Sequence, residues 1–404
     1  MDQILSDPFG WFNHLLHSLL EGWGLSPGFI SFALNLLGAF VMGLGVLFLT
    51  LFLIWAERKI IARIQDRLGP NRVGPFGILQ TVADLVKLVT KELIVPVGAD
   101  LGPYNLAPLL AVMSVVGLWA VIPLAPKLLG ADINVGVLYV VSIGAISTLS
   151  IMLAGISSNN KYALLGAFRT VAQMVSYAVP MVLALIVPTL LAGSMGMVEI
   201  VEEQRSIWFL VIAPVAALIF FISSIAEVGR TPFDLLEAES ELVAGFHIEY
   251  SGLRFGMFFV AEFLHAFTIS ALTTTLFLGG WQGPGAAEYP LLGLFYFGIK
   301  TALVYFVVIW VRGSFPRIRI DQMNQLNWKL ITPLALVSLM VTAVVEKLVV
   351  EMGLIRIGVH LGANLLLLAL TLWALRAYSR TVRRRVENPM SGLTQSAHQS
   401  LSGE

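Results

Sequence analysis

Nine runs of apolar residues, each long enough to cross a lipid bilayer, restrict the fold of this chain more than any other feature. Lipid offers no hydrogen-bond partners to the backbone, so a crossing segment forms a helix or joins a closed barrel, and about 20 apolar residues match the helical length. The sequence therefore predicts an all-α, polytopic transmembrane helix bundle of about nine spans, of which only the last is short. The predicted spans are 29–55, 103–123, 135–157, 171–192, 207–228, 255–278, 290–311, 330–349 and 359–376.

The distribution of Lys and Arg predicts how the bundle is oriented. With the N-terminus outside, twenty of the 25 basic residues fall on the cytoplasmic side and four fall outside. Loops rich in Lys and Arg stay cytoplasmic. An eight-span chain would place the Arg-rich segment 376–385 outside, so the tail independently favours nine spans. The long loops 56–102 and 229–254 are then cytoplasmic.

The composition excludes several classes of function. The chain is 57% hydrophobic and 12% charged, and its zero net charge gives no support for nucleic acid as a partner. The absence of cysteine excludes disulfides, thiolate zinc sites and cysteine-bound iron–sulfur clusters within the chain. His14 and His17 belong to a stretch that is better explained as an amphipathic interfacial segment than as a metal site. No Lys or Arg precedes Arg58, so the first span is expected to be a retained helix and not a signal peptide.

The first cytoplasmic loop carries two amphipathic patterns. Apolar residues recur at helical spacing over 60–68, which predicts a helix lying in the membrane surface. Gly69-Pro70-Asn71 ends that helix, and Pro75 can open a second one. On the second helix a polar stripe of Gln80, Asp84, Lys87 and Lys91 lies opposite an apolar face.

Two interpretations of these surface helices remain open. Basic side chains can simply reach toward anionic lipid headgroups. Alternatively, the helices form a platform for a ligand that has a polar head and a lipid tail. Gly69 to Gly77 is not a nucleotide-binding P-loop, because no Gly-Lys-Ser/Thr follows it.

The second long loop concentrates acidic residues between two spans. From Glu227 to Arg254 there are six acids against two bases. If residues 232–245 are helical, with Pro232 in the first turn, then Asp234, Glu237 and Glu241 share one face. A solvated acidic loop is the simplest interpretation, but it leaves the apolar residues of the loop unexplained. Crowded carboxyl groups in a low-dielectric site titrate near neutral pH, as a proton relay requires.

Ionisable residues inside the predicted spans indicate functional or structural pairs. Glu262 and His265 lie one turn apart in the sixth span, and Lys300 lies in the seventh. Glu262 and Lys300 are expected to form a pair, either functional or a structural salt bridge. Asn35 and Asn364 are expected to form hydrogen bonds between helices.

Taken together, the two loops resemble a known family. ERK…QDRLGPNRVGPFGILQTVADLVKLVTKE and AEVGRTPFDLLEAESELVAGFHIEY are similar to two signatures of the H/ND1-type membrane subunit of respiratory complex I, NADH:quinone oxidoreductase. SSNNKYALLG, AQMVSY and AEFLHAF also fit, and the similarity covers roughly residues 30–350.

The resemblance implies a set of roles for residues of this chain. It implies a quinone chamber lined by residues of the first loop and by the start of the second, and a proton path lined by carboxylates. The implied quinone-binding residues are Glu57, Arg58, Gln65, Arg67, Arg72, Asp84, Lys87, Arg230 and Phe233. The implied proton-coupling residues are Glu227, Asp234, Glu237, Glu239, Glu241, Glu249 and Glu262.

The resemblance also implies the surroundings of the chain. It implies a membrane component of a proton-translocating enzyme in a bacterial plasma membrane. Quinone would be its substrate, and FMN, NADH and the iron–sulfur clusters would lie in partner subunits, beside antiporter-like membrane subunits. No metal site is expected in this chain. Whether the quinone is ubiquinone or menaquinone does not follow from the residues.

One residue departs from the family pattern. Members commonly carry Glu after the Ser-Tyr of the fourth span, whereas Ala178 follows Tyr177 here. Either another group or water replaces that carboxylate, or the proton path runs differently.

The implied domain organisation has three parts: the membrane domain 1–350, an extra helix over 351–378, and a tail over 379–404 that is first basic and then disordered. Two alternative functions remain. One is the homologous subunit of a membrane-bound hydrogenase or another quinone-linked dehydrogenase. The other is a stand-alone proton or cation transporter, for which the expected inverted repeats are not visible.

Overall fold

The computed structural model describes residues 8–22, 26–126, 128–235, 243–349 and 354–387, and within them the chain is all-α. The elements are α2 (Pro8–Glu21), α3 (Pro27–Ile64), η1 (Pro75–Gly77), α4 (Gln80–Thr90), α5 (Leu101–Leu118), α6 (Gly136–Ser157), α7 (Lys161–Ala192), α8 (Met197–Glu203), α9 (Phe209–Ile212), α10 (Pro214–Val228), η2 (Gly245–His247), α12 (Gly252–Phe277), α13 (Pro290–Ser314), α14 (Ile320–Leu326), the π-helical turn η3 (Asn327–Ile331), α15 (Thr332–Val349) and α16 (Leu354–Glu387).

The predicted spans correspond to helices, with one exception. Within the described residues, eight helices have the length and apolar composition to cross a membrane, and the remaining predicted span, 207–228, is divided into α9 and α10. The division falls at Pro214, which has no backbone N–H to donate and starts a new helix. The expectation that only the last span is short was wrong: α16 has 34 residues, whereas α10 has 15.

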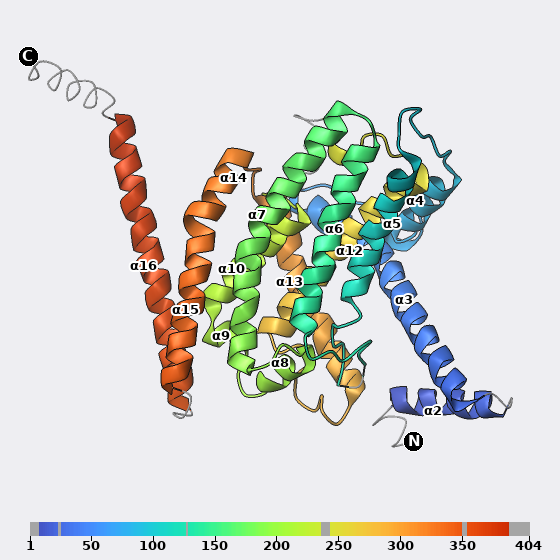
Figure 1. Ribbon diagram of the computed structural model, residues 1–404, viewed down its shortest axis with the longest axis horizontal. Coiled ribbons are helices and arrows are strands. Elements are labelled where there is room, and N and C mark those ends of the chain that lie inside the picture. Colours follow the sequence, from blue (N-terminus) through green and yellow to red (C-terminus); the bar gives the residue numbers. More distant parts are fainter. Residues whose placement is uncertain (1–7, 23–25, 127, 236–242, 350–353, 388–404) are drawn as a thin grey trace, which may run out of the picture.

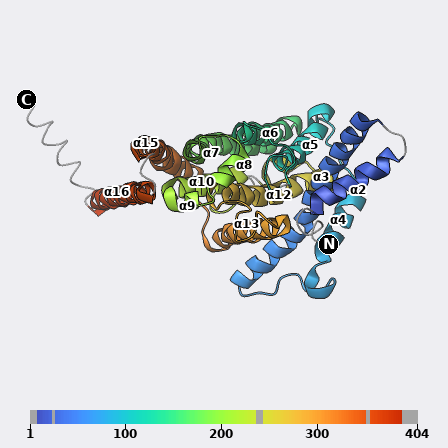
Figure 2. The same ribbon diagram turned by 90° about the horizontal axis from the view of Figure 1, so that it is seen from below.

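Burial distinguishes central from peripheral helices. In the most apolar windows of α7 and α12, 56% and 61% of the residues are buried, against 17% for α3 and α16. Figure 1 shows α5, α6, α7, α10 and α12 in the middle of the bundle, with α3 and α16 on opposite flanks. Viewed from below in Figure 2, α13 lies beside α12 on the face opposite α6. The site described below therefore lies among the central helices.

The helices alternate in direction between two ends of the molecule. In Figure 1, α2, α8 and the α15–α16 connection lie at one end, and α4, α14 and the end of α16 lie at the other. The two termini are accordingly on opposite sides, as an odd number of crossings requires. Which end faces the cytoplasm remains a prediction from the basic residues.

The expected surface helix over 60–68 is not separate. Instead α3 continues without a break from Pro27 to Ile64, because no helix breaker lies between its apolar and charged parts. At 1.5 Å per residue its 38 residues are longer than the roughly 30 Å hydrocarbon layer. The charged end of α3 therefore projects beyond the membrane. The second helix is confirmed, with η1 beginning at Pro75 and α4 at Gln80.

The described start of the acidic loop is a turn and not the first turn of a helix. A helix beginning at Pro232 would use the carbonyls of Pro232 and Phe233 as acceptors for later N–H groups. Here the Ile318 N–H takes the Pro232 carbonyl at 3.0 Å, and the side-chain amide of Gln173 takes the Phe233 carbonyl at 2.7 Å. These contacts from other segments hold residues 231–235 in a turn, and residues 236–242 lie outside the described residues.

Candidate functional site: a buried ion network beside a polar cavity

Glu57 is the centre of a buried ion network at the charged end of α3. Its side chain is 3% exposed. Arg230, after α10, donates to Oε1 at 3.1 Å, and the Tyr305 hydroxyl on α13 donates to Oε2 at 3.1 Å. Arg312, also on α13, donates to Oε1. Since a buried carboxylate is stable only when paired and hydrogen-bonded, these three donors account for its position.

Arg230 connects this carboxylate to a second one. Its Nε lies 3.2 Å from Glu262 Oε1 on α12, and its guanidinium lies 4.4 Å from the centre of the Phe263 ring. Arg230 is itself 3% exposed. A planar guanidinium can bind two carboxylates and stack on a ring at the same time, which a lysine cannot do. Arg230 therefore joins α3 to α12 through charge.

The expected pair between Glu262 and Lys300 was wrong. The Lys300 ammonium donates instead to the carbonyls of Leu278, Gly280 and Gln282 at 2.8, 3.1 and 2.8 Å. Leu278 caps the C-terminus of α12, where carbonyls have no helical partner and the helix dipole is negative. Lys300 satisfies that end of the helix, and this leaves Glu262 to Arg230.

A polar cavity lies on the other side of Glu262. Water-sized spheres can occupy about 40 Å³ of it, enough for a few water molecules. Glu227, His247, Glu262 and His265 line it among apolar residues of five helices. Glu227 Oε2 has no hydrogen-bond partner among the described residues. A buried oxygen without a partner, facing space for water, is suited to bind water or exchange a proton.

The described second half of the acidic loop closes this cavity. Phe246 and His247 line it, and burial lowers the pKa of His247 to about 4, so its ring is neutral at pH 7. Close packing positions the loop, because a Cβ on Gly166 would come within 2.8 Å of the Gly245 carbonyl carbon. Glu249 is held by Asn160 at 2.5 Å and does not line the cavity.

A second group of predicted residues meets at the surface beside α3. Arg58 donates to Asp84 at 2.6 Å, and Lys87 lies 3.9 Å from the same carboxylate. Gln65 pairs only with the neighbouring Arg67, at 2.7 Å, and Arg72 is exposed. The polar stripe of α4 thus faces the charged end of α3.

The remaining predicted residues fall elsewhere. Phe233 is buried and its ring lies 5.3 Å from that of Tyr177, and Asp234 is half-buried in the same turn. Glu237, Glu239 and Glu241 lie outside the described residues. Met174 lines the cavity one helical turn before Ala178, so the position that departs from the family pattern is on the helix face directed to the cavity.

Sequence reasoning missed three residues that support the site. Arg312 and Tyr305 bind Glu57, and Gln173 holds both Ala226 and Phe233 by their carbonyls at 2.7 Å. An amide inside an apolar run was a usable signal for Gln173, since polar groups in spans seek partners. Nothing in the sequence indicates that α13 reaches Glu57. Asn364 bonds the Ile212 carbonyl as expected, whereas Asn35 is exposed. Among the described residues, no three His, Asp or Glu side chains gather as metal ligands.

Comparison with known proteins decides the family. The family model described as NADH dehydrogenase matches residues 37–343. The chain belongs to the NADH dehydrogenase family. The matched range of the NADH dehydrogenase model begins within α3 and includes Glu57, Arg230, Glu262 and Arg312, so the ion network lies inside it. It ends before Glu346, and α16 lies wholly beyond it.

Curated relatives of this NADH dehydrogenase family member share its length as well as its residues, and all three compared here are H-type subunits of an NADH-quinone oxidoreductase. That of Geobacillus kaustophilus is 47% identical over 331 residues, which cover 81% of this chain and 99% of that protein. The one numbered 2 in Geobacter sulfurreducens is 49% identical over 306 residues, 74% of this chain and 92% of the relative. That of Dehalococcoides mccartyi strain CBDB1 is 48% identical over 293 residues, 72% of this chain and 81% of the relative.

Proposed function

We propose that this chain is the membrane subunit of an NADH:quinone oxidoreductase that forms the quinone chamber and couples quinone reduction to proton translocation. The observation that carries the proposal is the continuous charged connection from Glu57 through Arg230 to Glu262. It joins the charged end of α3 to the cavity that Glu227 lines. The names of the relatives support the enzyme class.

The quinone chamber is assigned to the charged end of α3 and the adjacent loops. A quinone has a polar head and an apolar tail, and α4 presents a polar stripe over an apolar face whose Val82, Val86 and Val89 are exposed. Arg58, Asp84 and Lys87 supply charged groups near the head, while Gln65, Arg67 and Arg72 lie at the mouth. Arg230 and Glu57 form the inner wall, and Phe233 packs behind it.

Coupling follows from electrostatics in a low-dielectric site. Two electrons from a partner subunit and two protons convert quinone to quinol, so negative charge develops at the head before the protons arrive. A negative charge near Arg230 competes with Glu57 and Glu262 for the same guanidinium. Weakened pairing changes the proton affinity of Glu262, and the cavity passes that change to Glu227. Asp234, Glu237, Glu239, Glu241 and Glu249 extend the proposed path along the acidic loop.

The proposal also places the chain in its surroundings. The N-terminus lies outside a bacterial plasma membrane and the basic tail lies in the cytoplasm, as the distribution of Lys and Arg predicts. Iron–sulfur clusters, FMN and NADH belong to peripheral subunits, because the chain has no cysteine and no dinucleotide-binding motif. Antiporter-like membrane subunits would receive the signal, which makes the assembly a translocase.

Proton translocation per NADH, measured in inverted membrane vesicles with the assembled complex, tests the coupling role. Glu227→Gln and Asp234→Asn are expected to lower protons per NADH at least twofold, because each removes a titratable group. Glu288→Gln, an exposed carboxylate remote from the cavity, is the matched control. Unchanged stoichiometry and turnover in Glu227→Gln would remove the cavity from the mechanism.

A further inference from the structure

The break between α9 and α10 leaves a backbone carbonyl without a helical partner. Ala213 is non-helical, with φ −129° and ψ 61°, and Pro214 has no N–H. The Ile212 carbonyl therefore cannot accept a bond from a continuing helix. The Asn364 side chain on α16 donates to it instead, at 3.1 Å. Inside a membrane such a carbonyl requires a partner, so this bond satisfies the break.

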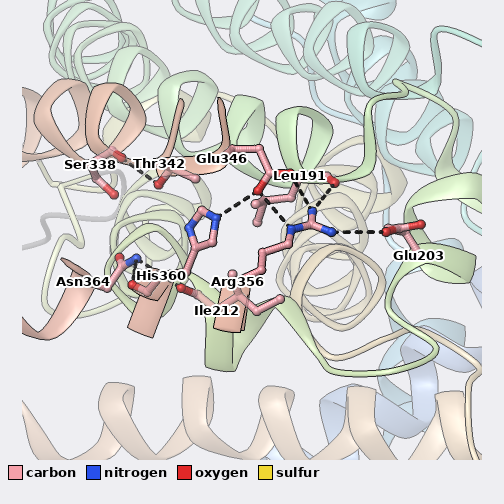
Figure 3. A network of polar contacts seen from close by, with 9 residues as sticks. All are labelled: Leu191, Glu203, Ile212, Ser338, Thr342, Glu346, Arg356, His360 and Asn364. Carbon is pink, nitrogen blue, oxygen red and sulfur yellow. Dashed lines mark hydrogen bonds and ion pairs between the residues drawn. The ribbon is translucent and has the colours of Figure 1, made fainter. Parts of the chain in front are cut away.

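A second set of polar contacts fixes the same end of α16, as Figure 3 shows. Glu346 on α15 accepts from Arg356 at 2.8 and 3.1 Å and pairs with His360 at 2.9 Å. Arg356 also donates to the Leu191 carbonyl of α7 at 3.3 Å and lies 3.9 Å from Glu203 of α8. Through these residues α16 is bonded to α7, α8, α9 and α15.

Apolar packing at this end is incomplete. A cavity of about 250 Å³ lies between α9 and α16, lined in part by Phe209, Ile212, Arg356 and Ile357. Where side chains do not fill the space between two helices, dispersion contacts contribute little to their relative position. The bonds from Asn364 and Arg356 are therefore the main restraints on the outer end of α9.

Helix α10 connects this end to the candidate site. It runs from Pro214 at the break to Val228, with Glu227 in its last turn and Arg230 two residues beyond its end. A helix of 15 residues behaves as a rod about 22 Å long, so a displacement of its outer end moves Glu227 and Arg230 as well.

We propose that α16 is a brace that fixes the axial position of α10, with Asn364 as the positioning residue for Glu227 and Arg230. The brace rests on the proposed function, because it acts through the proton-coupling carboxylate. It is an addition to the part of the chain that the family model describes, since Glu346, Arg356, His360 and Asn364 all lie beyond residue 343.

The first test replaces Asn364 by leucine, which keeps the volume and removes the donor. In inverted vesicles with the assembled complex, Asn364→Leu is expected to lower protons translocated per NADH at least twofold. Electron transfer from NADH to a water-soluble acceptor stays unchanged, because the peripheral subunits are intact. Leu365→Ala, on the neighbouring lipid-exposed face with 52% exposure, is the control and keeps wild-type stoichiometry. Wild-type stoichiometry in Asn364→Leu overturns the brace.

A cross-link separates positioning from general damage to folding. Because the chain has no cysteine, Ile212→Cys with Asn364→Cys introduces its only pair. Oxidation of this pair replaces the lost hydrogen bond by a covalent one and is expected to restore the stoichiometry, whereas reduction lowers it again. This comparison is made on one assembled preparation, so it also answers the question if Asn364→Leu fails to assemble. Equal stoichiometry in the oxidised and reduced pair overturns the proposal.

The outcome for Glu227→Gln distinguishes the brace from the proposed function. If Glu227→Gln lowers the stoichiometry and Asn364→Leu does not, only the brace is wrong. If neither variant changes it, the coupling role of the cavity is wrong as well.

Discussion

At the scale of single residues, the site depends on side chains that are far apart in sequence. Glu57 and Arg230 are separated by 173 residues, and Glu57 and Arg312 by 255. A buried ion pair is held by the rest of the fold and pays a desolvation cost, so removing one partner is more damaging than replacing both. This asymmetry makes Arg230 the most informative position to change.

Arg230→Ala is expected to destabilise the complex strongly, because it leaves Glu57 and Glu262 with fewer partners in a buried site. Breaking a buried pair costs roughly 3–5 kcal/mol. The thermal unfolding midpoint of the purified complex measures the loss. Arg58→Ala is the control: the Arg58 side chain is 46% exposed, and an exposed pair contributes about 0.2–1 kcal/mol. Equal effects of the two substitutions would contradict the assigned burial.

His247 makes stability depend on pH in a predictable direction. Burial lowers its pKa to about 4, below the ordinary 6.5, so the unfolded chain binds a proton between these values and the folded chain does not. Stability is therefore lost as pH falls from 6.5 to 4. At about 1.36 kcal/mol per pH unit, the loss at pH 5 reaches roughly 2 kcal/mol.

Thermal unfolding of His247→Gln at pH 7.5 and 5.0 checks this dependence. The substitution removes the titrating ring, so the difference between the two pH values is expected to shrink. His14→Gln, at an exposed position, is the matched control and keeps the wild-type difference. A His247→Gln protein as sensitive to acid as the wild type would show that another group is responsible.

At the scale of secondary-structure elements, tertiary contacts overrode local patterns in the acidic loop. Its composition suggested a helix beginning at Pro232, yet Gln173 of α7 takes the Ala226 and Phe233 carbonyls and Ile318 takes that of Pro232. Backbone acceptors used by other segments cannot also close helical turns. The turn at 231–235 therefore belongs to the packing of α7 against α10, and it aims Arg230 at Glu57.

Gln173→Leu is expected to lower both stability and quinone reductase turnover. The change leaves two buried carbonyls without a donor, each costing about 1–3 kcal/mol, and it releases the turn that follows Arg230. Ser176→Ala is the control, because the Ser176 hydroxyl bonds only within its own helix, to Ala172. The unfolding midpoint and NADH:quinone turnover are measured together, and wild-type values for both in Gln173→Leu would refute the role of the amide.

At the scale of the whole molecule, the alternation of helices places the two ends of the chain on opposite sides of the membrane. The base-rich end of α3, α4 and the end of α16 lie together at one end of the bundle, and α2 and α8 lie at the other (Figure 1). Attraction of basic residues to the cytoplasmic side then orients the entire bundle.

Single cysteines test this orientation, since the chain has none of its own. Ser206→Cys, in the α8–α9 connection, is expected to react with a membrane-impermeant maleimide in right-side-out vesicles. Ser379→Cys, near the end of α16, is expected to react only in inverted vesicles. The reverse pattern would invert the orientation, and labelling of both from one side would contradict an odd number of crossings.

The sequence by itself determined the helical class, the nine crossings and their alternating direction, and the amphipathic helix α4. These properties depend on the length of apolar runs, on breakers such as Pro75 and on the positions of basic residues, all of which are local. The family resemblance identified Glu57, Arg230 and Glu262 as residues that matter, but not that they touch.

Only the tertiary structure decided which buried charges meet. Glu262 pairs with Arg230 and not with Lys300, because the open carbonyls at the end of α12 bind the ammonium. Arg312 reaches Glu57 because α13 packs against α3. The break before Pro214 is satisfied by Asn364, which lies 152 residues after Ile212 in the chain. Each pairing is a competition among groups brought together by folding, and a local pattern contains no information about its competitors.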